Sequence, residues 1–409
     1  MNRRRIGIAL GVGIVTAAIV VILVMVFRAE ESGGTELKLK PTPAENDAME
    51  ASHVESGQKL IDGGLDYLLA QRNADGGWGP EGYKPAYTAL VVRALARHPD
   101  AGGKLKPVID RAVEVLMSYR KGDGGFYDQR AQNYTTSVVV SALTAVGDPK
   151  LQRAVNDAVK YLEGLQIRPG EETPDGDVIT AEHPFRGGTS YGKHGRPDLS
   201  NLGFTIEAWH EAGVSAESPG IQEAVIFLKR TQNRSESNPL AWAAAGENDG
   251  GFAYAPALKG NLTTGESKAG PAGPNQKGLR SYGSMTYVGF KSLLYAGLAK
   301  DDPNVQAAFD WIRENWRLDS NPNMPQKRSK QGLYYYYLAF ARALRAWGQP
   351  VIKDKSGAEH NWRHELIDAL KDRVRPDGSW LNEADRWNEG DPVLVTAYAV
   401  LALQEAFAG

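Results

Sequence analysis

The sequence predicts an all-α protein: a closed (α/α)6 toroid of paired inner and outer helices, preceded by one N-terminal transmembrane helix. Three observations predict it. An uncharged apolar stretch lies near the N-terminus, a two-helix unit recurs through the rest of the chain, and the second helical segment of each unit is apolar nearly all round. A helix that is apolar on all sides is usually buried. We therefore expect the second helices to form an inner layer and the amphipathic first helices an outer layer.

The apolar stretch runs from Ile6 to Phe27 and follows Arg3, Arg4 and Arg5. As a helix it would be about 33 Å long, enough to cross the ~30 Å hydrocarbon core of a bilayer. The preceding arginines predict that the N-terminus lies on the cytoplasmic side of the membrane and the body on the opposite side. A cleaved signal peptide is the alternative, but its apolar region is normally only about 7–15 residues long. We expect an uncleaved signal anchor in the cytoplasmic membrane, with a periplasm-facing body.

The chain is expected to have three parts. Residues 1–28 form the signal anchor, residues 29–54 a flexible polar linker, and residues 55–409 the α/α toroid of about six repeats. The formal net charge of −2 argues against a nucleic-acid partner, which requires a strongly basic face. The chain has no cysteine, which excludes disulfides, thiolate zinc ligands and cysteine nucleophiles.

Each repeat has the same order of parts. A helical segment with apolar residues at i, i+3 and i+4 comes first, an Asp-Gly-Gly-aromatic segment follows, and a helical segment rich in Ala, Val and Leu completes the unit. Glycines permit turns that other residues avoid, so the middle segment should break the helix. Its aromatic residue recurs at Trp78, Phe126, Phe252 and Trp380, with a variant around Tyr191 and a degenerate fifth copy. An open solenoid is the alternative, although the polar end repeats that solenoids require are missing.

The combination of Gln71 with Gly76-Gly77-Trp78 resembles the repeat motif of squalene and oxidosqualene cyclases. The paired-helix unit also resembles that of protein prenyltransferase β subunits and of the thioester domain of complement-like proteins. The chain is similar, too, to bacterial proteins with prenyltransferase and squalene oxidase repeats. The resemblance covers roughly residues 55–409 and implies the α/α toroid fold. It does not settle the chemistry, because one fold supports many functions.

The sequence departs from the family's three known kinds of site. Cyclases that protonate an alkene carry Asp-x-Asp-Asp, whose middle acid donates the proton. The matching segment here is Asp198-Leu199-Ser200-Asn201, so Ser200 stands where the acid is needed. Prenyltransferases bind zinc partly through cysteine, and thioester proteins use a Cys-Gln pair, so the lack of cysteine excludes both. We expect no metal, no cofactor and no squalene cyclisation by alkene protonation.

One candidate site lies on the loop before the third inner helix. Asp198 is expected either to cap this helix or to act directly in a site. Lys193, His194 and Arg196 lie just upstream. Three cations beside a helix N-terminus could bind a carboxylate, phosphate or diphosphate; a solvated basic loop is the alternative.

Tyrosines mark the beginnings of two further inner helices. Tyr282 and Tyr287 lie in a hydroxyl-rich segment at the fourth, and Tyr335 lies in a run of four tyrosines at the fifth. Rings that line a cavity would suit an apolar or planar ligand. Plain packing against neighbouring helices is the alternative.

The loop before the sixth inner helix is the densest polar segment. Its carboxylates Glu389 and Asp391 are candidates for acid and base catalysis. Arg386 and Trp387 lie beside them as candidate ligand-binding residues, although Arg386 could equally neutralise a neighbouring acid.

Three functions remain open from the sequence. The first is a membrane-anchored binding module that holds an isoprenoid, lipid or peptide ligand in its central cavity without chemistry. The second is a diverged enzyme of the cyclase and prenyltransferase class. The third is an (α/α) barrel acting on carbohydrate, which would need Glu389 and Asp391 opposite a stacking ring such as Trp387. The missing acids favour the first function, and whether the protein is an enzyme stays undecided.

Overall fold

The computed structural model describes residues 49–173, 175–193, 195–258 and 265–408. The expected signal anchor at residues 1–28 lies outside these residues, as do residues 29–48 of the expected linker. Within the described residues, none of the helices combines the length and the apolarity that crossing a bilayer requires.

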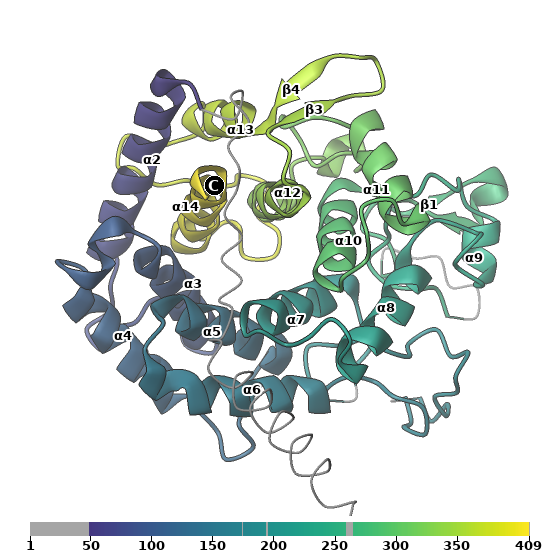
Figure 1. Cartoon of the computed structure of the whole chain (residues 1–409), viewed down its shortest axis with the longest axis horizontal. Helices are drawn as coiled ribbons and strands as arrows, with labels where there is room; N and C mark the ends of the chain where they lie inside the picture. Colours follow the sequence, from purple (N-terminus) through teal and green to yellow (C-terminus); the bar gives the residue numbers. More distant parts are fainter. Residues whose placement is uncertain (1–48, 174, 194, 259–264, 409) are drawn as a thin grey trace, which may run out of the picture. The chain divides into compact units, whose positions relative to one another are not determined.

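The described residues form a mostly helical protein, as predicted, with its long helices in two layers (Figure 1). The outer layer contains α2 (Ala51–Ala70), α4 (Lys106–Ser118), α6 (Gln152–Gly164), α8 (Pro219–Thr231), α11 (Pro303–Glu314) and α13 (Trp362–Lys371). The inner layer contains α3 (Lys84–Ala96), α5 (Gln132–Val146), α7 (Leu199–Glu211), α10 (Gly283–Tyr295), α12 (Leu333–Trp347) and α14 (Pro392–Phe407).

The inner helices pack against one another in chain order. Helix α3 contacts α5, and the contacts continue through α7, α10, α12 and α14, which in turn contacts α3. Most residues of α3 and α14 are buried on all sides, as their apolar composition predicts. The outer helices instead alternate buried and exposed positions, because only one of their faces covers the inner layer.

The Asp-Gly-Gly-aromatic segments lie between the outer and the inner helix of their repeats. The backbone N–H of Trp78 donates to Thr88 Oγ1 on the following inner helix at 2.9 Å. The same bond recurs in three further repeats, as the pairs Phe126–Thr136, Phe252–Thr286 and Trp380–Thr396. A Cβ on Gly77 would lie 2.9 Å from Thr88 Oγ1, whereas the sixth repeat forms the equivalent bond with Ser379 at this position.

The glutamines of the repeat connect neighbouring units. Gln166 Nε2 donates to the carbonyl oxygens of Gly187 and Gly220, at 3.1 and 2.8 Å. Gln232 Nε2 makes the equivalent pair of bonds to Gly250 and Asn304, at 2.9 and 2.8 Å. Each amide therefore joins the glycine turn of its own repeat to the beginning of the next outer helix.

Several short elements connect the long helices. Strands β1 (Pro271–Ala272) and β2 (Gly278–Leu279) form one antiparallel pair, and β3 (Val351–Lys353) and β4 (Glu359–Asn361) form another. The remaining elements are α9 (Ala241–Ala244) and the 3-10 turns η1 (Pro99–Gly102), η2 (Pro149–Leu151), η3 (Pro274–Gln276) and η4 (Gln326–Arg328). The sequence did not predict the two strand pairs.

A cluster of buried charges lies near the C-terminal ends of the inner helices. Glu207 of α7 accepts from Arg93 of α3 at 2.7 Å, from Arg342 of α12 at 2.8 Å, and from Lys291 of α10. In the same region, Glu405 of α14 pairs with Arg97, which directly follows α3, and with Arg345 of α12. Ion pairs therefore join the inner helices at this end, opposite the end at which they begin.

Candidate functional site

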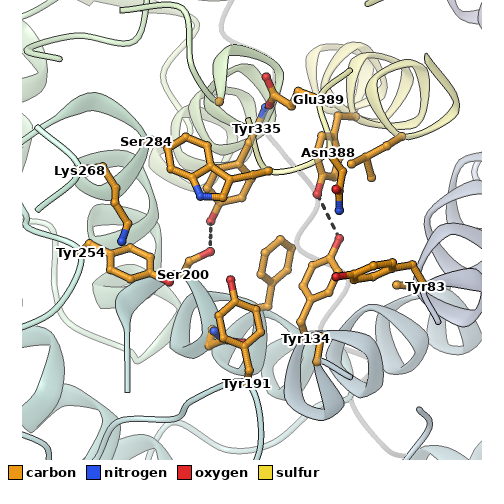
Figure 2. Close-up of a pocket in the computed structure, with 18 of the residues that line it drawn as sticks. Tyr83, Tyr134, Tyr191, Ser200, Tyr254, Lys268, Ser284, Tyr335, Asn388 and Glu389 are labelled. Atoms are coloured by element: carbon orange, nitrogen blue, oxygen red, sulfur yellow. Dashed lines mark hydrogen bonds between the residues drawn. The ribbon is translucent and has the colours of Figure 1, made fainter. Parts of the chain in front are cut away.

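A cavity of about 520 Å³ lies at the N-terminal ends of the inner helices (Figure 2). This volume falls within the ~300–1,000 Å³ that is usual for small-molecule sites. Ten of the 22 residues of its wall are aromatic: Tyr83, Tyr87, Tyr134, Tyr191, Phe204, Tyr254, Tyr282, Tyr335, Trp387 and Tyr398. Because these rings come from several repeats, the cavity requires the folded repeats together.

Hydroxyl groups on the cavity wall bond in pairs. Ser200 Oγ lies 3.0 Å from the Tyr335 hydroxyl, and the hydroxyls of Tyr134 and Tyr398 are also 3.0 Å apart (Figure 2). Burial raises the pKa of Tyr134 to about 12, and burial also raises the pKa of Tyr335 and Tyr398. These phenols are therefore neutral at physiological pH and serve as hydrogen-bonding groups.

Asp198 lies behind the cavity wall. It is the N-cap of α7, where Oδ1 accepts from the backbone N–H of Asn201 at 2.8 Å and Oδ2 accepts from Asn201 Nδ2 at 2.7 Å. Its side chain is buried, and this burial raises its pKa to about 6. Asp198 is absent from the cavity wall, whereas the next residues of the same motif, Ser200 and Asn201, line it.

Glu389 is the buried carboxyl of the cavity wall, with 1% of its surface exposed. Its Oε1 accepts from the backbone N–H of Tyr335 at 2.8 Å, and its Oε2 accepts from Asn382 Nδ2 at 2.5 Å. It therefore caps the N-terminus of α12 from a different repeat. Burial raises the pKa of Glu389 to about 7, although these hydrogen bonds oppose the shift.

Lys268 supplies a cation to the cavity wall. Its ammonium lies 4.0 Å from the ring centroid of Tyr254, a cation–π contact (Figure 2). In the described part of the chain, no carboxylate oxygen lies within ion-pair distance of Lys268 Nζ. Burial lowers the pKa of this amine. Sequence reasoning did not identify Lys268, because it lies in a long loop that carries no repeat signal.

Of the predicted aromatic residues, Tyr282, Tyr335 and Trp387 line the cavity, whereas Tyr287 does not. Tyr287 is fully buried, with its ring edge-on to Tyr336 at 5.5 Å between centroids. Tyr287 therefore has a packing role, which was the alternative to cavity lining in the sequence analysis. Trp387 has 42% of its surface exposed and lies at the edge of the cavity against Gly332.

The remaining predicted residues of the loop before α14 lie outside the cavity wall. Asp391 is the N-cap of α14, where its Oδ1 accepts from the backbone N–H of Val393 at 2.9 Å. Arg386 stacks on Trp387, with 5.5 Å between the guanidinium carbon and the ring centroid. Glu389 and Asp391 are thus not brought together as a carboxylate pair facing one cavity.

The structure does not gather the predicted basic loop at the cavity. Lys193 lines a separate, much smaller pocket together with Gly195. Arg196 forms an ion pair with Glu266 at 2.6 Å. The third predicted cation, His194, lies outside the described residues. Arg130 and Lys268 are instead the cationic side chains of the cavity wall.

Comparison with known proteins identifies the fold. No protein-family model matches this chain, and no curated protein matches it. Among solved structures, it resembles the type II terpene cyclase MstE from Scytonema in complex with merosterolic acid A, with 16% identity, 88% of this chain and 99% of that chain covered, and a TM-score of 0.53. This likeness shows a terpene cyclase-like fold and carries no statement about the reaction.

Two further solved structures share the architecture. A protein from Actinoplanes is 17% identical, with 86% of this chain and 100% of that chain covered and a TM-score of 0.50. A novel alpha-amylase from Clostridium perfringens is 12% identical, with 88% and 99% covered and a TM-score of 0.50. The predicted likeness to the cyclase class is therefore confirmed at the level of the fold, which amylase-like helical barrels share.

Proposed function

We propose that this protein binds a hydrophobic ligand of the isoprenoid or lipid class in its aromatic cavity, without cyclising it. The observation that carries the proposal is the cavity wall, in which ten of 22 residues are aromatic. Aromatic side chains bury large apolar areas, and their hydroxyls keep one edge polar. An isoprenoid or lipid is favoured over a peptide because the wall is dominated by aromatic rings.

We also propose that the described repeats form a closed (α/α)6 toroid. Support comes from the contact of α14 with α3, which makes the sixth inner helix a neighbour of the first. Contacts of α14 and α13 with α2 add a second connection between the last repeat and the first.

The absence of a strong acid at the motif position supports binding over cyclisation. Ser200 and Tyr335 face each other there with neutral hydroxyls. A hydroxyl is far too weak an acid to protonate an alkene, a step that requires a tuned carboxylic acid. Asp198, the remaining acid of the segment, uses both oxygens to accept hydrogen bonds from Asn201.

A diverged enzyme is the second candidate, and Glu389 is the observation that favours it. This carboxyl lines the cavity, and its pKa of about 7 is suited to general acid catalysis at neutral pH. The carbohydrate hypothesis has less support, because Asp391 caps α14 and does not face the cavity with Glu389.

Ligand binding can be tested by copurification. The full chain, incubated with a total lipid extract and repurified, is expected to retain defined molecules that mass spectrometry identifies. Ala86→Trp, which fills the cavity from α3, should abolish retention. Ala74→Trp, an exposed position in the loop after α2, is the matched control and should retain the same molecules. Equal retention by wild type and Ala86→Trp would contradict the proposed site.

The location of the protein is a separate proposal. We propose that residues 1–28 anchor it in the cytoplasmic membrane with the body on the periplasmic side, on the basis of the uncharged stretch after Arg3, Arg4 and Arg5. A reporter enzyme that is active only in the periplasm, fused after Gly409, should be active, and washed membranes should retain the protein. A silent reporter, or a mature N-terminus near Ala29, would contradict this topology.

A further inference from the structure

A group of metal-binding side chains lies where the first and the last outer helices meet. Helix α2 contacts α13, and His53 of α2 stacks face to face on His364 of α13, with 3.9 Å between ring centroids and 5° between ring planes. Glu50, the N-cap of α2, lies beside both rings. One donor atom from each of Glu50, His53 and His364 lies within 4.8 Å of the other two.

The hydrogen bonds of His53 leave one ring nitrogen available. Its Nε2 lies 3.3 Å from Asp368 Oδ2, so this nitrogen carries the proton and donates it to the carboxylate. Nδ1 then presents its lone pair. This atom is buried, has no hydrogen-bond partner, and lies 3.5 Å from Glu50 Oε2. A histidine whose other nitrogen is held by a carboxylate is the usual arrangement of a metal ligand.

His364 also presents a lone pair toward Glu50. Its Nε2 accepts from the backbone N–H of Glu50 at 3.3 Å and lies 3.4 Å from Asn361 Nδ2. Both distances are long for hydrogen bonds to nitrogen, so a metal ion could replace these contacts at modest cost.

We propose that Glu50, His53 and His364 bind a divalent transition-metal ion, with zinc as the best match. Two imidazoles and one carboxylate are a common ligand set for zinc, and water completes a tetrahedral site. Zinc lies in the plane of each imidazole that binds it, at about 2.0–2.1 Å from nitrogen. The stacked rings therefore turn about χ2, a broad torsion in histidine, until their lone pairs converge. Asp368 orients His53 from behind.

The position of the site suggests what the metal would do. Glu50 and His364 are 314 positions apart in the sequence, one at the beginning of the first outer helix and the other on the last. An ion bound by both residues would cross-link the first outer helix, α2, to the last, α13. Because it would bind only the folded arrangement, it would stabilise the folded protein by mass action. Sequence reasoning did not predict this site, because no short spacing connects its residues.

Zinc binding to the purified full chain tests the proposal, after removal of any affinity tag and treatment with EDTA. Isothermal titration should show one zinc ion per chain, and saturating zinc should raise the Tm by about 2–6 °C. His53→Asn and His364→Asn should each abolish the binding and the Tm rise. Asp368→Asn should raise the Kd for zinc about 10–100-fold, as expected for a residue that orients a ligand.

His98→Asn is the matched control. His98 Nε2 lies 3.3 Å from Asp62 Oδ1, the same carboxylate pairing as in His53, and Nδ1 accepts from the backbone N–H of Asp100. This variant should bind zinc as wild type does. Wild-type protein that binds no zinc would overturn the proposal, as would His53→Asn and His364→Asn variants with undiminished binding. An equal loss of Tm in EDTA and in zinc for these variants would show a packing role only and would also overturn it.

Discussion

The carboxyl group of Glu389 caps a helix and also lines the cavity. Its oxygens satisfy backbone N–H groups at the beginning of α12, which have no partners within the helix. The same side chain is buried in the wall of an aromatic cavity, where desolvation penalises its charge. The sequence placed this residue among the site candidates as an acid, and the structure shows that it also holds the tyrosine-rich helix in place.

The pH dependence of stability should reveal Glu389. Its pKa is about 7 in the folded protein, above the ordinary glutamate value of 4.5, so the folded state binds the proton more tightly than the unfolded state does. The stabilisation is complete below about pH 4.5 and is lost as the pH rises through 7, by about 3 kcal/mol. Urea unfolding between pH 4.5 and 7.5 should show this loss in wild type, and Glu389→Gln should lack it. Parallel curves for both proteins would contradict the shift.

Squalene should not be cyclised by this protein. Ser200 stands at the position of the donor acid and offers only a hydroxyl paired with Tyr335. The acid starts the reaction in such cyclases, so its absence should leave essentially no turnover. Detergent-solubilised protein incubated with squalene should yield no cyclic product by gas chromatography and mass spectrometry. A product that survives Asp198→Asn but vanishes in Glu389→Gln or Asp391→Asn would identify a second acid and refute this account.

In four of the repeats, a threonine on the inner helix bonds to the backbone of the preceding turn. Thr136 Oγ1 accepts from the backbone N–H of Phe126 at 3.0 Å and donates to its carbonyl oxygen at 3.0 Å. Thr136→Val keeps the shape of the side chain but leaves the backbone N–H and carbonyl oxygen of Phe126 buried without this partner. This change should cost about 1–3 kcal/mol of unfolding free energy. Thr136→Ser keeps the hydroxyl and should cost less. Chemical denaturation measures both, and equal losses would show that the methyl group matters more than the bond.

The helices followed from the sequence because their signals are local. The segments that predict each pair of helices all lie within a single repeat. They are the apolar periodicity of the first helix, the glycine-containing turn and the uniformly apolar second helix. The strand pair β3–β4 was missed, because Val351–Lys353 and Glu359–Asn361 are too short to show alternation. The segment between them is also polar, and the pair lies in the connection between the fifth and sixth repeats, outside the repeated pattern.

The site was predicted only in part, for a related reason. Tyr282, Tyr335 and Glu389 were identified because they begin or precede inner helices, which all reach the cavity at the same end. Lys268 was missed because its place depends on the path of a long loop. Tyr287 was expected to line the cavity because it lies near the beginning of α10. Its ring instead packs against the rings of Tyr336 and Phe340 on α12. Sequence patterns indicate which end of a helix reaches a cavity, and tertiary packing decides which side chains line it.

At the scale of the whole molecule, the two ends of the inner-helix layer differ. Ion pairs connect inner helices at their C-terminal ends, and the aromatic cavity lies at their N-terminal ends. Glu207 meets Arg93, Lys291 and Arg342, each from a different inner helix. These cations lower the pKa of Glu207 against the opposing effect of burial. Glu207 is thus the carboxylate that the three cations share, while Glu211 also pairs with Arg93 and Glu405 also lies 3.8 Å from Arg342.

Removing the charge of Glu207 should destabilise the whole protein. Glu207→Gln leaves buried cations without their common partner, which should cost about 3–5 kcal/mol of unfolding free energy. Glu114→Gln is the control, because Glu114 is 65% exposed and pairs with Arg111 on its own helix. That change should stay within about 0.5 kcal/mol. Similar urea midpoints for the two variants would show that the buried cluster contributes little.

The contact of the last inner helix with the first repeat has a consequence for chain connectivity. Phe407, near the end of α14, packs against Gly57 of α2, so the two termini of the described repeats are neighbours in space. We therefore expect that the repeat at which the chain begins is not essential to the assembled structure. A circular permutant of residues 49–408, with its old termini joined by a short glycine linker and new termini at the exposed turn near Asp148, should fold. Circular dichroism should show the same helix content as the unpermuted residues 49–408, and a largely unfolded permutant would show that the natural starting point matters.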